Sequence, residues 1–269
     1  MVKYYLINLK MKVFAVVLLF AFAYGATIPE DQPEDVEEFQ LPDFVKTCYE
    51  DDPKLGECVK EAVSDMMPRL NNGLKALNIP PLDPFTIERT SLEYGNGALQ
   101  GAIKMKNLKT FGMSQAVFRD VRMKIEDGKV ETEIDIHFPK IFMEGAYKAD
   151  IKFNELKLHP KGHFNVTMTN INTTHHWEGH LVPKNGHQYL QIDTFDMIPE
   201  VGDMKIYVGG IFPDPAMNKI AVNFLNQYWP AFYKMLLPET RSHWQPLMTN
   251  SINEFLGRVP FDLLVKKRE

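Results

Sequence analysis

The spacing of apolar side chains changes twice along the chain and divides it into three parts. Between residues 55 and 70, apolar side chains recur every three or four positions, which predicts an amphipathic helix. Asp52-Pro53 predicts its start, because Asp caps a helix and Pro fits the first turn. Pro68 predicts a kink, and Gly73 suits the left-handed residue that ends many helices. The first part is therefore helical.

From about Phe85 to Val208 the period becomes two, which is typical of strands with one buried face. The clearest stretch covers residues 130–138, whose apolar side alternates with Glu131, Glu133, Asp135 and His137. Asp127-Gly128 and Asn185-Gly186 predict hairpin turns between such stretches. The second part is an antiparallel meander with one dry face and one wet face. Its dry-face side chains include Ile134, Ile136, Phe138, Tyr147, Ile151, Val166 and Met168.

After residues 212–215 the helical period returns and continues to Leu256. A single helix over 217–256 would be about 60 Å long. Its broad apolar stripe includes Phe224, Tyr228, Trp229, Phe232 and Met235. Pro230, Pro238 and Pro246 should bend or interrupt it. The order helix, meander, long helix predicts an α+β fold in which a strongly curved antiparallel sheet wraps the long C-terminal helix, with an additional N-terminal helix.

The N-terminus predicts export. Lys3, Lys10 and Lys12 precede an apolar run over 13–22, and small residues allow cleavage before Ala26. The run is too short to anchor the chain in a bilayer. We therefore divide the chain into a signal peptide over 1–25, an acidic leader over 26–40 and a single domain over 41–269. The expected product is a secreted, extracellular monomer.

Cys48 and Cys58 are the only two cysteines. In an exported chain they are most simply one disulfide, which joins the segment before the first helix to that helix. Cys58 lies on the apolar face of the helix, so the bridge should be largely buried. The net charge of −5 argues against nucleic acid as a partner.

The sequence holds no G-x-S-x-G, H-E-x-x-H or phosphate-binding glycine motif, so no enzymatic activity and no cofactor is predicted. The histidines of residues 175–180 could in principle bind zinc. In a strand, however, His176 and His180 share a face and His175 points away, so we interpret all three as solvated strand residues and predict no metal site. Asn165 and Asn172 head sequons for N-glycosylation.

The chain contains 18 Phe and 14 Met. Met lines adaptable pockets, but composition alone does not distinguish a filled core from a tunnel. If there is a tunnel, the dry-face and stripe residues above line it, and the hydroxyl of Tyr147 or Tyr228 sets the orientation of the ligand.

Several motifs resemble one family when read in order. They are Leu41-Pro42-Asp43-Phe44 with the stretch that follows to Cys48, the cysteine pair, residues 68–73, the connector 79–84, residues 224–229 and the closing stretch 252–262. Together they are similar to the insect juvenile-hormone-binding and takeout proteins, secreted lipid carriers. The resemblance covers nearly the whole mature chain, and the single cysteine pair is closer to the takeout branch.

The resemblance implies a carrier in haemolymph or another extracellular fluid, with juvenile hormone or a similar terpenoid or lipid in an internal apolar tunnel. Two alternatives remain open. A secreted hydrolase of lipid esters is disfavoured by the missing nucleophile motif. An extracellular interaction protein would have the same apolar interior as ordinary core.

Overall fold

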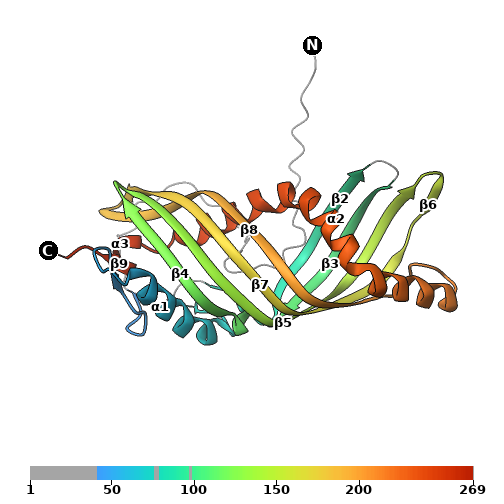
Figure 1. The fold of residues 1–269 in the computed structure, drawn as a ribbon, viewed down its shortest axis with the longest axis horizontal. Coiled ribbons are helices and arrows are strands. Elements are labelled where there is room, and N and C mark those ends of the chain that lie inside the picture. The colour runs from blue at the N-terminus through green and yellow to red at the C-terminus, as the bar shows by residue number, and fades with distance from the viewer. Residues whose placement is uncertain (1–40, 76–78, 97–98, 269) are drawn as a thin grey trace, which may run out of the picture.

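The computed structural model describes residues 41–75, 79–96 and 99–268. The predicted signal peptide and acidic leader lie outside these residues. Figure 1 shows the helices α1 and α2 together with a large twisted sheet. The elements are β1 (Cys48–Tyr49), α1 (Leu55–Leu70), β2 (Phe85–Asn96), β3 (Leu99–Phe111), the 3-10 turn η2 (Met113–Gln115), β4 (Val117–Glu126), β5 (Lys129–Phe153), β6 (Leu156–Leu158), β7 (Lys161–Lys184), β8 (His187–Val208), α2 (Pro215–Leu256), α3 (Phe261–Leu264) and β9 (Val265–Lys266).

The main sheet has seven strands in the order β2-β3-β5-β7-β8, with β4 and β6 also paired to β5, and every one of these pairs is antiparallel. Its first strand begins at Phe85 and its last ends at Val208, so the predicted meander is confirmed at both limits. The α+β class is confirmed as well. The sheet is not closed, and it covers only one side of the long helix instead of wrapping it.

In the three longest strands, β5, β7 and β8, the alternation of buried and exposed side chains breaks at the same level. The sheet is creased along this line. On β5 the buried side chains change from even to odd positions across Pro139 and Lys140, and on β7 the change falls at Asn170. Asn170 has a positive φ of 52°, and a Cβ on its β8 neighbour Gly202 would lie 2.9 Å from the Asn170 Cβ. These interruptions fall at one level of the sheet without a shift of register between the strands. They explain how this long sheet becomes curved.

The crease separates two halves that differ in their cover. The α1 half comprises β4 with residues 129–138, 171–184 and 187–201. There, α1 packs along the edge strand β4, and α2 packs along the opposite edge strand β8. A Cβ on Gly56 of α1 would lie 2.0 Å from the Val121 carbonyl oxygen, so the two backbones approach as closely as only glycine allows.

The β2 half comprises β2, β3 and β6 with residues 141–153, 161–168 and 204–208. Its β8 edge also carries α2, whereas no helix in the described part of the chain packs comparably on β2. Figure 1 shows α1 and β4 at one end of the molecule and β2, β3 and β6 at the other, with α2 passing along both.

Two asparagines of α2 pair with the open edge of β8 as a neighbouring strand would. The amide of Asn226 accepts from the Ile206 N–H at 2.8 Å and donates to the Ile206 carbonyl at 2.6 Å. Asn253 does the same with Ile192, at 2.6 and 2.7 Å. The helix between these asparagines is about 40 Å long, and the strand between their partners about 46 Å. The edge strand is therefore satisfied by a helix that runs antiparallel to it.

The prolines of α2 do not end it. The helix runs without interruption over 42 residues through Pro230, Pro238 and Pro246, although Figure 1 shows that its course is not straight. The sequence left open whether the prolines bend or interrupt the helix, and the structure shows one continuous helix. Asp214 caps its start by accepting from the Met217 N–H at 2.8 Å.

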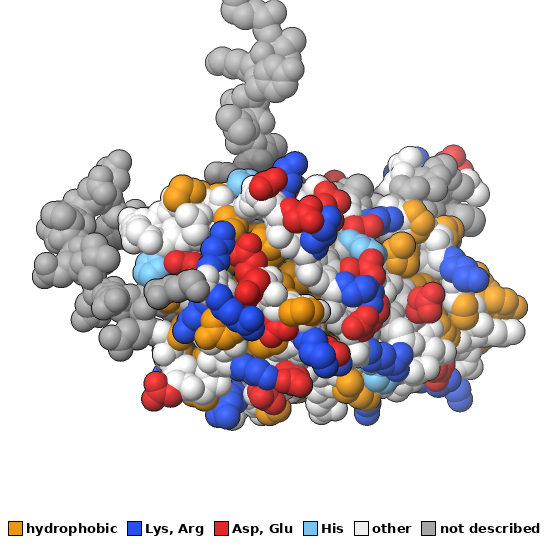
Figure 2. Space-filling view, turned by 60° about the vertical axis from the view of Figure 1, so that its left-hand side comes forward, with side chains coloured by type: hydrophobic (Ala, Val, Ile, Leu, Met, Phe, Trp, Pro, Cys, Tyr) orange, Lys and Arg blue, Asp and Glu red, His pale blue; other side chains and the backbone are white. Residues whose placement is uncertain are grey.

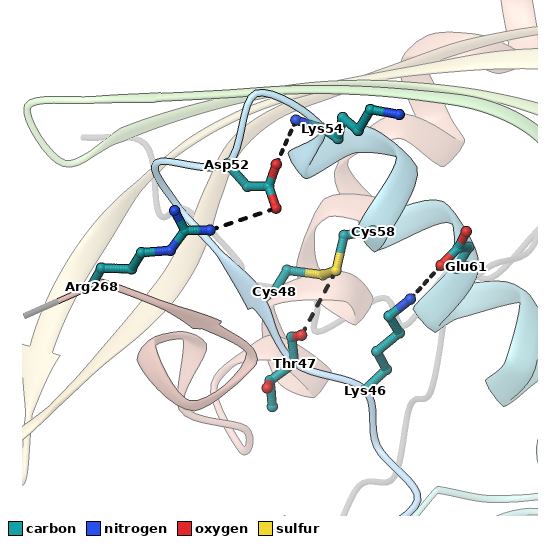
Figure 3. Close-up of a disulfide and its surroundings, with 8 residues drawn as sticks. All are labelled: Lys46, Thr47, Cys48, Asp52, Lys54, Cys58, Glu61 and Arg268. Carbon is teal, nitrogen blue, oxygen red and sulfur yellow. Dashed lines mark hydrogen bonds and ion pairs between the residues drawn. A yellow bond between two sulfur atoms is a disulfide. The ribbon is translucent and has the colours of Figure 1, made fainter.

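Cys48 and Cys58 form a disulfide with a Cα–Cα distance of 5.9 Å, as predicted (Figure 3). Cys48 is buried, and β1, which contains it, pairs with β9 near the C-terminus. The bridge therefore links α1 to both ends of the described chain. The start of α1 differs from the prediction: Asp52 accepts from the Lys54 N–H at 2.8 Å, and the helix begins at Leu55.

Candidate ligand-binding site

The predicted dry face of the sheet lies inside the molecule. Ile134, Ile136, Phe138, Val166 and Met168 are all buried and belong to one apolar cluster. Tyr147 packs against the same cluster, and Ile151 is half-buried. The strands thus bring the predicted wall together. That this wall contacts a ligand stays a prediction.

The long helix presents a different side from the one expected. Phe224, Tyr228 and Met235 are 52%, 44% and 41% exposed, so the prediction that they face the sheet is wrong. Since a helix turns about 100° per residue, these positions share one face, and Trp229 lies on another. Trp229 packs against the inner cluster. Phe232 is half-buried, and its ring centroid lies 5.8 Å from that of Phe224.

The two tyrosines expected to orient a ligand lie in different surroundings. The Tyr147 hydroxyl donates to the Gly209 carbonyl at 3.1 Å, and burial raises the pKa of this tyrosine. Tyr228 lies on the exposed face of α2. A third hydroxyl, that of Tyr233, donates to the Pro199 carbonyl at 2.9 Å, and burial raises its pKa to about 12.

The histidine-rich stretch of β7 divides between the two faces of the sheet. His176 pairs with Glu133 at 2.9 Å and His180 with Asp193 at 2.8 Å, both on the wet face, as predicted. His175 is fully buried, so its interpretation as a solvated residue is wrong. The cause is the break in alternation at Asn170, a residue with a positive φ: continuing the alternation of Val166 and Met168 would have placed His175 outside.

His175 does not lie alone inside the sheet. Thr173 and Trp177 share its face, and with the buried Thr132 of β5, which lies opposite Trp177, they make a polar stretch on a mostly apolar wall. The pKa of His175 falls to about 3, mainly because burial disfavours the imidazolium and secondly because His176 lies nearby. The ring is therefore neutral at physiological pH. Sequence reasoning missed this polar stretch.

The wet face is charged and well paired. Arg122 binds Asp120, Glu133 and Asp135, and these contacts raise its pKa. Figure 2 shows acidic and basic side chains interspersed over one face of the molecule. The sequon residues Asn165 and Asn172 lie on this side of β7, and Asn172 Oδ1 lies 2.9 Å from His137 Nδ1. Their glycosylation stays a prediction.

Other kinds of site find little support in the described residues. Across 41–75, 79–96 and 99–268, no three His, Cys, Asp or Glu side chains gather in a way that could hold a metal ion. Within the same residues no helix has both the length and the apolar character to cross a bilayer. A shallow pocket of about 370 Å³ near β9 has a mixed polar and apolar lining that includes Leu41, Asp43 and Lys266.

Residues 16–266 match the family described as haemolymph juvenile hormone binding protein. The chain belongs to this family. Its fold is similar to that of Takeout 1 from Epiphyas postvittana, with a TM-score of 0.65 at 18% identity over 82% of this chain and 100% of that one. A weaker match, to a lipopolysaccharide binding protein, has a TM-score of 0.37 at 16% identity over 79% of this chain and 40% of the other. No curated protein sequence matches the chain significantly.

The resemblance to the juvenile-hormone-binding and takeout proteins is thus confirmed, and the similarity to Takeout 1 confirms the fold. The family is one of binding proteins found in haemolymph, as its description states.

Proposed function

We propose that this protein is a secreted, non-enzymatic carrier that binds an elongated hydrophobic molecule, juvenile hormone or a similar terpenoid or lipid, between the inner face of the sheet and α2. One observation carries the proposal: the inner face carries one buried apolar cluster with side chains from β4, β5, β7 and β8, and Trp229 of α2 packs against it. Family membership supports the same conclusion.

The energetics suit such a ligand. Burial of about 400 Å² of apolar ligand surface contributes roughly 10 kcal/mol before the costs of association. Those costs leave an affinity in the micromolar to nanomolar range. The ligand-contacting residues that we propose are Ile134, Ile136, Phe138, Tyr147, Ile151, Val166, Met168 and Trp229.

The first test is native mass spectrometry of secreted protein from its own source, with extraction of any bound lipid. A carrier should retain a stoichiometric hydrophobic molecule. Incubation with a panel of labelled lipid esters tests the alternative of a hydrolase, and catalytic turnover would overturn the carrier function.

A substitution separates a ligand-filled interior from an ordinary core. Ile136→Trp should abolish binding of a fluorescent lipid at little cost in melting temperature if the added volume enters space that the ligand uses. In a filled core the same change should destabilise by about 1–3 kcal/mol. Phe224→Trp on the exposed face of α2 is the matched control and should change neither quantity.

A further inference from the structure

Three polar side chains on the inner face of β7 are buried without a partner. Thr173 and His175 are 4% and 0% exposed, and Trp177 is half-buried with its Nε1 shielded from solvent. The Thr173 hydroxyl, both ring nitrogens of His175 and Trp177 Nε1 have no hydrogen-bond partner within the described part of the chain. Native proteins pair nearly all buried polar groups, so a run of unpaired ones indicates a missing partner.

The surroundings of this run show what kind of partner fits. His175 lies opposite Ile134 on β5 and opposite Met197 on β8. The Phe195 ring lies 5.5 Å from the His175 ring, centroid to centroid, and 6.3 Å from the Trp177 ring. None of these neighbours carries a charge, so the site has no counterion to offer an ionised ligand.

The hydrogen-bonding capacity of the three residues is also defined. A neutral imidazole offers one donor and one acceptor, an indole offers a donor only, and a threonine hydroxyl offers both. Alternate residues of a strand lie about 7 Å apart, so His175 can share one ligand atom with either neighbour. A carbonyl, ester or hydroxyl oxygen matches this set.

We propose that Thr173, His175 and Trp177 bind the uncharged oxygen function of the hydrophobic ligand and so fix which end of the ligand lies in the α1 half. This inference rests on the proposed carrier function. The same strand continues from the polar residues to Ile171, Met168 and Val166, over roughly 36 Å between Trp177 and Val166. These residues are buried and apolar, so the hydrocarbon part of the ligand extends along them across the crease.

The test compares ligands that differ only at one end. Full-length secreted protein is titrated with 1-dodecanol, methyl dodecanoate, dodecanoate and dodecane, each displacing the fluorescent probe N-phenyl-1-naphthylamine. The alcohol and the methyl ester should bind at least about tenfold more tightly than dodecane, because dodecane cannot form hydrogen bonds with the buried polar groups. Dodecanoate should bind more weakly than the methyl ester.

Variants then assign the selectivity to the site. His175→Leu and Trp177→Phe should each reduce the ratio of dodecane to dodecanol dissociation constants to within about twofold, while dodecane affinity is kept. His175→Gln keeps a donor and an acceptor and should retain most of the selectivity. His176→Gln, on the wet face, is the matched control. Trp177→Phe decides the question should His175→Leu fold poorly in thermal unfolding.

The outcomes distinguish the two proposals. Equal affinity of wild-type protein for dodecanol and dodecane, or selectivity that survives in Trp177→Phe, overturns the polar site and leaves the carrier function standing. Absence of binding by all four ligands overturns the carrier function and this inference with it.

Discussion

The two halves of the sheet share the strands β5, β7 and β8 but are covered unequally. In the α1 half, helices pack along both edges, and Leu55 of α1 joins Met248 and Ile252 of α2 in one buried cluster. In the β2 half, α2 is exposed on its outer side, where Ile220 and Phe224 are 62% and 52% accessible. The same helix is thus part of a core at one end and half uncovered at the other.

This difference shows that the pattern of apolar residues along a helix does not by itself determine which of its faces is buried. The N-terminal part of α2 carries apolar side chains both toward β8 and away from it. A helix that is apolar all round is expected to be buried. Here the sheet covers only one side of α2. Apolar residues on that side should therefore stabilise the fold, and those on the outer side should contribute little.

The largest expected effect on stability comes from replacing an isoleucine of α2 in the α1 half, compared with the same replacement in the β2 half. Ile252→Ala removes a side chain with no exposed surface and should lower the free energy of unfolding by about 2–5 kcal/mol. Ile220→Ala on the outer side of the same helix should change it by less than about 0.5 kcal/mol. Urea denaturation measures both. Similar losses in the two variants would mean that the outer side of α2 is covered in solution.

The asparagines that bind β8 should contribute equally in the two halves. Asn253→Leu and Asn226→Leu each leave the N–H and the carbonyl of one edge residue, Ile192 or Ile206, without these partners. Each variant should lose about 1–3 kcal/mol of unfolding free energy. Chemical denaturation of both variants checks this. A large loss for Asn253→Leu alone would show that the helix is held along the α1 half only.

Much of this architecture could be predicted from the sequence, because periodicity reports local geometry directly. The meander from Phe85 to Val208 and the disulfide are examples. Periodicity fails where the extended backbone of a strand is interrupted, since every later side chain then lies on the other face. Asn170 has this effect and so hides His175. An Asn and a Gly at facing positions of two long strands were the available signal.

The α2 side of the site was mispredicted for a different reason. With apolar residues on several faces, the sequence cannot indicate whether Phe224 or Trp229 points toward the sheet. Asn226 could have indicated it, because a polar side chain within an apolar stretch needs a partner, and the edge of β8 supplies one.

Stability of the α1 half should depend on pH through His175. Its pKa is about 3 in the folded protein and 6.5 in the unfolded chain, so only the unfolded chain takes up a proton between these values. His175 therefore has little effect on the free energy of unfolding above pH 6.5. As the pH falls below that value, it lowers the free energy of unfolding, by about 2 kcal/mol at pH 5 relative to pH 7. Denaturation at the two pH values should show this difference in wild type and lack it in His175→Leu. An unchanged pH dependence in the variant would contradict the burial of the ring.

The smallest expected effect lies on the wet face of the same half, at Asp135. The Thr174 hydroxyl donates to Asp135 at 2.6 Å, and this bond is the main cause of the lowered pKa of the carboxyl group, with Arg122 adding to it. A lowered pKa stabilises the folded state above the ordinary value of 3.8 and loses that effect as the pH falls further. Thr174→Val should therefore weaken the acid dependence below about pH 4, and because Asp135 is partly exposed the change should amount to only a few tenths of a kcal/mol. Acid titration followed by circular dichroism measures it. A change in the pH dependence of stability as large in Thr174→Val as in His175→Leu would contradict the difference in burial between the wet and dry faces of β7.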